Sequence, residues 1–152
     1  MIKMIVIDDE FLVRVGIKET ISWHEYGVEI VGEAPNGKSG LELVKALQPD
    51  IIITDIKMPV MDGLELVKRI KELNYENEII ILSGYKDFEY AKDTLENGAF
   101  SYLLKPIDNK ELIEKVLSAI KKLNEERNTK NFIENLRADI PAIKNKIVQD
   151  IL

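Results

Sequence analysis

The sequence contains no cysteine, one tryptophan and one histidine among its 152 residues. The lack of cysteine excludes a disulfide framework and any metal site built on thiolates. No apolar run approaches the roughly 20 residues that a membrane-spanning helix needs. The N-terminal stretch MIKMIVIDDE also lacks the hydrophobic region and cleavage site of a signal peptide. These absences predict a cytoplasmic protein that does not enter a membrane.

Positive charge is also in short supply. The chain has 21 lysines and arginines against 27 aspartates and glutamates, for a net charge of −6. An acidic chain of this kind lacks the electrostatic footprint of a nucleic-acid-binding protein. If the protein acts on DNA, we expect the DNA-reading part to lie outside this sequence. The 45% of hydrophobic residues are enough for a core, and the length fits one domain with an appendage.

Short apolar runs alternate with amphipathic segments along the first 122 residues. We expect strands at 3–8, 28–34, 50–55, 78–83 and 99–104, and helices at 10–22, 37–47, 63–73, 86–96 and 108–122. Strict alternation predicts an α/β fold with a parallel sheet and helices on both faces. Five repeats favour the flavodoxin-like (βα)5 doubly wound arrangement, with strand order 2-1-3-4-5. In the first helix, we expect Leu12, Val15 and Ile21 to face the core.

Chemically matched residues follow four of the five expected strands. They are Asp8, Asp9 and Glu10, then Asp55, Ser83 and Lys105. The carboxyl ends of parallel strands meet at one edge of the sheet, so these groups are expected to converge there. Clustered carboxylates repel one another, and a magnesium ion (Mg2+), which prefers oxygen ligands, would relieve that repulsion.

An aspartate beside such an ion can accept a phosphoryl group, while a lysine and a hydroxyl hold the phosphoryl oxygens. Each residue taken alone is a common turn, cap or surface residue. Their coincidence at one edge favours phosphoryl transfer over these ordinary roles.

Several stretches match a known family in order and spacing. They are IDDE at 7–10, DIIITDIKMPVMDGLEL at 50–66, ILSGY at 81–85 and GAFSYLLKPI at 98–107. With these motifs, residues 1–122 resemble the receiver domain of two-component response regulators. The resemblance implies that Asp55 is the phosphoacceptor and that Mg2+ is the cofactor. It further implies that Asp9 and Asp55 bind the metal directly, Asp8 acts mainly through water, and Lys57 contributes its backbone carbonyl.

The resemblance also implies a switch. Lys105 would pair with the phosphoryl group, through a backbone fixed by a cis bond to Pro106. Ser83 would be the switch hydroxyl, and Tyr102 the aromatic side chain that moves inward after it. The polar helix expected at 86–96 fits an element weakly anchored enough to respond.

The implied partner is a sensor histidine kinase whose phosphohistidine donates the phosphoryl group. Such a protein is not an enzyme for other substrates, because it catalyses phosphoryl transfer to, and hydrolysis from, only its own Asp55. The stretch SGYKDFEYAK at 83–92 resembles receivers joined to AraC-type helix-turn-helix output domains. We therefore expect transcription regulation, with DNA bound through a domain absent from this chain.

Residues 123–152 form an expected helical linker after the receiver. Apolar residues repeat at alternating three- and four-residue steps at Ile133, Leu136, Ile140, Ile143 and Ile147. This spacing is typical of a coiled-coil seam and predicts a homodimer. Pro141 predicts a helix break or a new helix start near residue 140. The competing interpretation is a helix folded against its own receiver, and we favour the dimerising linker.

Two other classes of function fit the sequence less well, and a third stays open. A phosphatase of the haloacid-dehalogenase type needs a second aspartate two residues after Asp55, where this chain has Lys57. A nucleotide- or flavin-binding fold is disfavoured by the acidic DDEF loop, and GEAPNGKSG lacks the GxxxxGK[ST] order. A receiver-like module that only dimerises, without phosphorylation, stays open.

His24 has no companion ligands and is expected in a loop, with Trp23 covering the end of the core.

Overall fold

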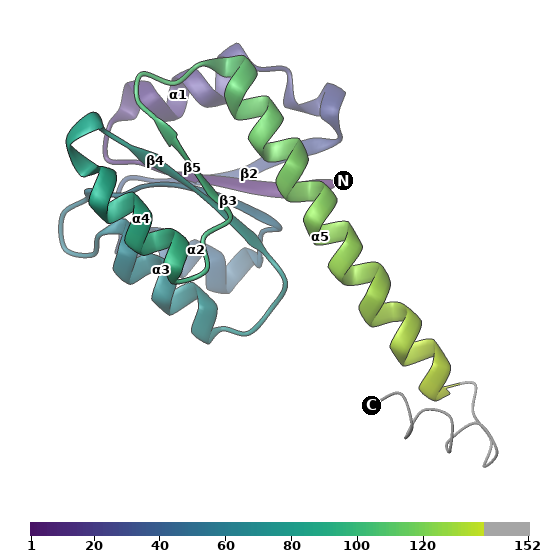
Figure 1. The fold of residues 1–152 in the computed structure, drawn as a ribbon. Helices are drawn as coiled ribbons and strands as arrows, with labels where there is room; N and C mark the ends of the chain where they lie inside the picture. The colour runs from purple at the N-terminus through teal and green to yellow at the C-terminus, as the bar shows by residue number, and fades with distance from the viewer. Residues whose placement is uncertain (139–152) are drawn as a thin grey trace.

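The computed structural model describes residues 1–138, in which helices enclose a parallel β-sheet (Figure 1). The five strands lie in the order β2-β1-β3-β4-β5, as predicted, and all pairs are parallel. The strands are β1 (Ile2–Ile7), β2 (Val28–Ala34), β3 (Ile51–Asp55), β4 (Glu78–Ser83) and β5 (Ser101–Leu104). The most apolar strand, β3, is central, and every one of its residues is buried.

Helices cover both faces of the sheet. They are α1 (Phe11–Thr20), α2 (Gly37–Leu47), α3 (Gly63–Glu72), α4 (Phe88–Glu96) and α5 (Asn109–Ala138), with 3-10 turns η1 (Trp23–Tyr26) and η2 (Tyr85–Asp87). Successive strand residues point to opposite faces. Ile52 accordingly joins the core shared with α2, α3 and α4, while Ile51 and Ile53 join the core shared with α1 and α5. Trp23 closes the second core, where its indole donates a hydrogen bond to the Ile17 carbonyl at 2.9 Å.

Of the three residues predicted to face the core from the first helix, Ile21 is buried, Val15 is only half-buried and joins neither core, and Leu12 is exposed. Leu12 is 80% exposed, whereas Ile17 and Ile21 are buried and Val13 packs beside them. The stripe that faces the sheet follows the four-residue spacing of Val13, Ile17 and Ile21. Leu12 lies one residue out of that phase, so its side chain is turned from the core.

Helix α5 passes through residues 122 and 123 without a break and continues to Ala138. Its first half packs on the sheet through Leu112, Val116, Ala119 and Leu123, and its second half projects past the sheet (Figure 1). Of the expected seam, Ile133 and Leu136 lie on this helix, while the other members lie outside the described residues, as does the predicted break at Pro141. No helix within 1–138 is long and apolar enough to cross a membrane.

Candidate functional site

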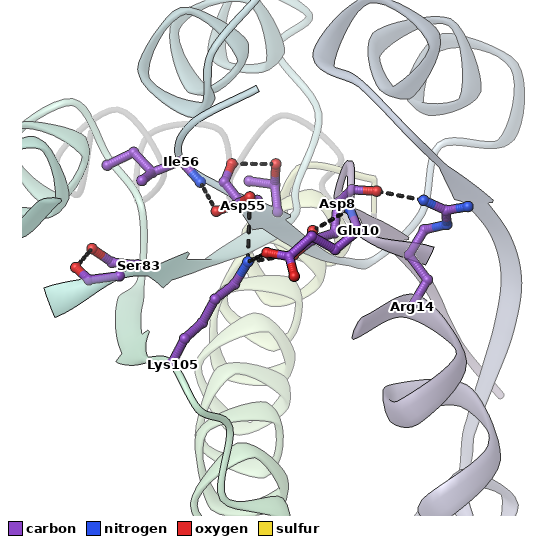
Figure 2. Close-up of polar contacts among 9 residues, drawn as sticks. Asp8, Glu10, Arg14, Asp55, Ile56, Ser83 and Lys105 are labelled. Carbon is purple, nitrogen blue, oxygen red and sulfur yellow. Dashed lines mark hydrogen bonds and ion pairs between the residues drawn. The ribbon is translucent and has the colours of Figure 1, made fainter. Parts of the chain in front are cut away.

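The carboxyl edge of the sheet brings the predicted residues from distant parts of the chain together (Figure 2). In the register, Ile7 pairs with Thr54 and Ser83 with Leu104. Asp8 and Asp55, which follow Ile7 and Thr54, therefore lie at the same level, and Lys105 lies two residues beyond Leu103, which is level with Asp55. The strands before Asp8 and Asp55 are buried on both faces near their ends, so the core holds the backbone that supports these two residues. Lys105 follows β5, in which only Leu103 is buried.

Lys105 stands among three carboxylates. Its ammonium lies 3.0 Å from Asp8 Oδ2, 3.3 Å from Asp55 Oδ2 and 3.3 Å from Glu10 Oε1. The Lys105–Pro106 peptide bond is cis, as the family resemblance implied. One lysine thus faces more negative charge than it can neutralise.

Burial controls the ionisation of the two inner carboxylates. Asp55 is only 6% exposed. Its loss of hydration, together with the nearby charge of Asp8, raises the pKa of Asp55 to about 6, although Lys105 opposes the shift. Burial likewise raises the pKa of Asp8, opposed by the hydrogen bond from the Glu10 amide and by the nearby Lys105 ammonium. The ionised forms of Asp8 and Asp55 are therefore destabilised at this edge of the sheet.

The Asp55 carboxylate is held from two sides. Its Oδ1 accepts a hydrogen bond from the Ile56 amide at 2.8 Å, so Oδ2 is the oxygen that faces Lys105. The Thr54 hydroxyl donates to the Asp55 carbonyl at 2.9 Å. The loop after β3 folds back so that the Gly63 amide donates to the Ile56 carbonyl at 2.6 Å. The chain around Asp55 is consequently closed into a tight turn at the start of α3.

The same edge fits a divalent cation. Asp8, Asp9, Glu10 and Asp55 each offer a carboxylate oxygen, and these oxygens lie within 4.8 Å of one another. The Asp8 Oδ2 atom is buried and accepts no well-formed hydrogen bond. Oxygen donors, excess negative charge and an incompletely satisfied buried oxygen are what a hard ion such as Mg2+ requires. Glu10, to which no metal role was assigned from the sequence, belongs to this set.

The Lys57 side chain points away from the acidic cluster. Its ammonium lies 3.0 Å from Asp87 Oδ1 and 5.8 Å from the centre of the Tyr90 ring. The ion pair with Asp87 raises the pKa of Lys57. Through this contact the loop after the phosphoacceptor candidate touches the start of α4. The predicted role of the Lys57 carbonyl as a metal ligand stays a prediction.

The two predicted switch residues lie on the neighbouring strands. Ser83 is fully buried, and its hydroxyl donates to the Gly84 carbonyl at 3.1 Å rather than to Asp55. The Tyr102 ring meets the Phe88 ring edge-on, with centroids 6.1 Å apart. Helix α4, which carries Phe88, buries only Ala91 and Thr94. The aromatic contact therefore joins β5 to a helix with a small apolar anchor.

Sequence reasoning missed Arg14. Its guanidinium donates to the Asp8 carbonyl at 2.6 Å and to Glu33 Oε1 at 3.0 Å. The hydrogen bond from Arg14 is the main reason that the pKa of Glu33 is lowered. Arg14 thus links the backbone of the acidic loop after β1 to Glu33 on β2. Figure 2 shows its contact with Asp8. The only signal in the sequence was an arginine one turn into the helix that follows the acidic run.

The chain is similar in sequence to a known protein family and to its members. Residues 4–117 match the family described as the response regulator receiver domain. An uncharacterized transcriptional regulatory protein, YesN of Bacillus subtilis, is 35% identical over 145 residues, which is 95% of this chain. That match spans 39% of YesN, so this chain corresponds to well under half of its relative.

Two solved structures are similar in fold and sequence. The receiver domain of AraT, a response regulator from Geobacillus stearothermophilus, is 38% identical with a TM-score of 0.77, covering 82% of this chain and 97% of that one. A two-component transcriptional regulator AraC from Clostridium phytofermentans is 31% identical with a TM-score of 0.77, covering 84% and 98%.

Proposed function

Because this chain belongs to the response regulator receiver family, we propose that it accepts a phosphoryl group on Asp55 from the phosphohistidine of a sensor histidine kinase. The observation that carries the proposal is the placement of Asp55 Oδ2, 3.3 Å from Lys105 and inside a cluster of carboxylates. We place this reaction in the cytoplasm, where receiver domains typically act. The chain modifies itself and is not an enzyme for other substrates.

The proposed transfer forms one bond to phosphorus and breaks another. A carboxylate oxygen of Asp55 forms the new P–O bond while the P–N bond of the phosphohistidine breaks, and the departing histidine nitrogen keeps the electron pair. With a pKa of about 6, Asp55 is mostly ionised at neutral pH and can act as the nucleophile. Lys105, already beside Oδ2, would pair with the incoming phosphoryl oxygens. Ile56 holds the other oxygen and keeps the carboxylate oriented.

The metal ligands are assigned to Asp8, Asp9, Asp55 and the Lys57 carbonyl. When bound there, Mg2+ supplies positive charge for the phosphoryl oxygens. The surplus of carboxylates over ammonium groups at this edge supports the assignment. Glu10 is placed to remain a partner of Lys105, at 3.3 Å.

The switch follows from the same geometry. Ser83 would exchange its hydrogen bond to the Gly84 carbonyl for one to a phosphoryl oxygen, and Tyr102 would shift in response. Since Tyr102 contacts Phe88, that shift would reach α4, which has few buried residues of its own. The face formed by α4, β5 and α5 is thus the proposed output surface.

The proposed output is transcription regulation through an AraC-type DNA-binding domain that is not within this chain. The similarity to YesN, a transcriptional regulatory protein, and to the Clostridium two-component transcriptional regulator supports this. We further propose a homodimer that pairs through the linker seam that includes Ile133 and Leu136. Residues 1–122 would act as the receiver and 123–152 as the linker.

The test is intact-mass analysis after incubation with acetyl phosphate, with and without Mg2+. We expect a single phosphoryl adduct that requires Mg2+, is absent in Asp55→Asn and is strongly reduced in Asp9→Asn. Asp93→Asn, which removes an exposed carboxylate from α4, is the matched control and should keep the adduct. An unchanged adduct in Asp55→Asn would overturn the assignment, and no adduct at all would favour a module that dimerises without phosphorylation.

A further inference from the structure

The projecting half of α5 is bound to the opposite edge of the sheet from Asp55. Three basic residues of the helix each meet an acidic residue near the amino ends of β3 and β4. The pairs are Lys122–Glu78 at 3.4 Å, Arg127–Asp50 at 2.5 Å and Lys130–Glu76 at 3.1 Å. We call these three pairs the α5 latch.

Apolar packing cannot orient this part of the helix. The last buried residue of α5 is Leu123, and 15 residues of the helix follow it, up to and including Ala138. Within residues 124–138, contact with the sheet edge is made by charged side chains, Arg127 and Lys130. Apart from the continuity of the helix itself, the ion pairs of the latch are therefore the contacts that hold this segment against the sheet edge.

The central pair has a rigid partner. Asp50 is only 9% exposed, and its Oδ2 accepts a hydrogen bond from the Lys3 amide at 2.8 Å. Its own amide donates to the Lys3 carbonyl at 2.8 Å, and its carbonyl accepts from the Glu78 amide at 3.0 Å. A carboxylate fixed in this way loses little further freedom when Arg127 binds it, unlike an ordinary surface pair. Glu78, the neighbouring anchor, is likewise buried.

The spacing of the three basic residues along the helix allows the latch to restrict the orientation of the helix. Lys122 and Lys130 are eight positions apart, which is about 12 Å along the helix axis, and Arg127 lies between them. At about 100° per residue they share one side of the helix. Three anchors spread over about 140° of one side of the helix resist both swinging of the helix and rotation about its axis. Ile133, the first residue of the predicted seam, follows Lys130 within one turn.

We propose that the α5 latch is a conformational device that fixes the direction in which α5 leaves the receiver, and with it the position of the chain that follows. The interacting pairs come from the receiver body and the helix of the same chain. The device does not require Asp55 to accept a phosphoryl group, so it stands or falls separately from the proposed function. Because its contacts are ionic and partly exposed, salt should weaken it.

The experiment measures the direction of the helix in solution. The chain has no cysteine, so Lys68→Cys on α3 and Asn135→Cys on α5 provide two unique sites for spin labels. Double electron–electron resonance would then give the distribution of distances between them. We expect a narrow distribution for the otherwise unchanged chain at low salt, widening about twofold in Arg127→Gln and in Asp50→Asn, and widening at high salt.

Controls separate the latch from general charge loss and from unfolding. Lys121→Gln removes an exposed lysine outside the latch and should leave the distribution narrow. Glu76→Lys and Lys130→Glu should each widen it, and the two together should restore it by reversing the pair. Asp55→Asn should have no effect, and thermal unfolding by circular dichroism checks that each receiver is folded. A distribution already broad in the unchanged chain, or equally narrow in Arg127→Gln, would overturn the proposal.

Discussion

The backbone of Gly63 lies directly against the carbonyl of Asp55. A Cβ at Gly63 would be 2.7 Å from the Asp55 oxygen and 2.8 Å from Ile56 Cα. Both obstacles are backbone atoms of the turn that orients the phosphoacceptor candidate, so neither can move aside alone. The missing side chain at Gly63 is therefore what allows α3 to begin so close to the end of β3.

We predict that Gly63→Ala lowers the free energy of unfolding by about 1–3 kcal/mol, since overpacking against backbone forces the turn open. The phosphoryl adduct on Asp55 should form more slowly for the same reason. Gly16→Ala is the matched control, because a Cβ at Gly16 meets nothing within 4 Å. In the interior of α1 it should raise stability by up to about 1 kcal/mol. Urea denaturation measures both, and equal effects would contradict the prediction.

Asp55 gives a pH dependence with a defined sign. Its pKa is about 6 in the folded protein against an ordinary value of 3.8, so the folded state holds the proton more tightly. The stability that this proton provides is present below about pH 4 and is lost as pH rises through about 6. Asp55→Asn should therefore be more stable than the unchanged chain at pH 7.5, by about 1–3 kcal/mol.

The difference between the two proteins should shrink as pH falls toward 4, when both side chains are neutral. Added Mg2+ should also reduce it, because the ion stabilises only the form that has the carboxylate. Denaturant titrations from pH 4 to 8, with chelator or with Mg2+, measure this directly. Asp93→Asn serves as the control. A stability gap that is flat across this range would show that burial of Asp55 is not the cause.

Much of the site could be predicted because strand ends are readable from apolar periodicity. Asp8 and Asp55 each follow a buried apolar run, Lys105 follows the more exposed strand β5, and the parallel-sheet rule places all three at one edge. The phase of α1 was harder, since Leu12 and Val13 are equally apolar and only the final docking angle decides which is buried. That distinction depends on three-dimensional packing that no short sequence window contains.

Contacts between distant charged residues could not be predicted. Arg127 and Asp50 are 77 positions apart, and their meeting depends on where α5 crosses the sheet edge. The chain has many charged residues, so charge alone does not pair them. The same holds for Lys57 and Asp87, which lie on different loops and meet only because η2 leads into α4 beside the site.

Val60 is held in an unfavourable backbone conformation. Its φ is +71°, and the Met61 amide donates to the Pro59 carbonyl at 2.8 Å across it, forming a γ-turn. A β-branched residue rarely adopts this region, and the Val60 side chain is 92% exposed, so no packing compensates. We predict that Val60→Asn raises stability by about 1 kcal/mol, because asparagine tolerates a positive φ. The melting temperature in thermal unfolding measures this gain in stability.

The reciprocal change provides the control for Val60. Asn74 is also exposed and has a φ of +53°, but asparagine is a residue type that tolerates a positive φ. Asn74→Val should lower the melting temperature where Val60→Asn raises it. If both changes moved stability in the same direction, side-chain exposure rather than backbone conformation would be the governing factor.

Lys57 links the site loop to α4 through its side chain. Its ion pair with Asp87 and its place over Tyr90 hold the start of a helix that buries only Ala91 and Thr94. We predict that Lys57→Gln speeds amide hydrogen exchange in the first turns of α4 several-fold and leaves β3 unchanged. Lys92→Gln, an exposed lysine on α4 itself, is the control and should have little effect.

High salt should reproduce the effect of Lys57→Gln in the unchanged chain, because the ammonium is exposed and the pair is screened. Exchange measured by mass spectrometry at low and high salt separates this from a change in side-chain volume. Unaltered exchange in α4 would mean that its contacts with α3, β4 and β5 hold the helix without help from Lys57. In that case, any signal from Asp55 to α4 would have to pass through Ser83 and Tyr102, since the loop that carries Lys57 would exert no hold on the helix.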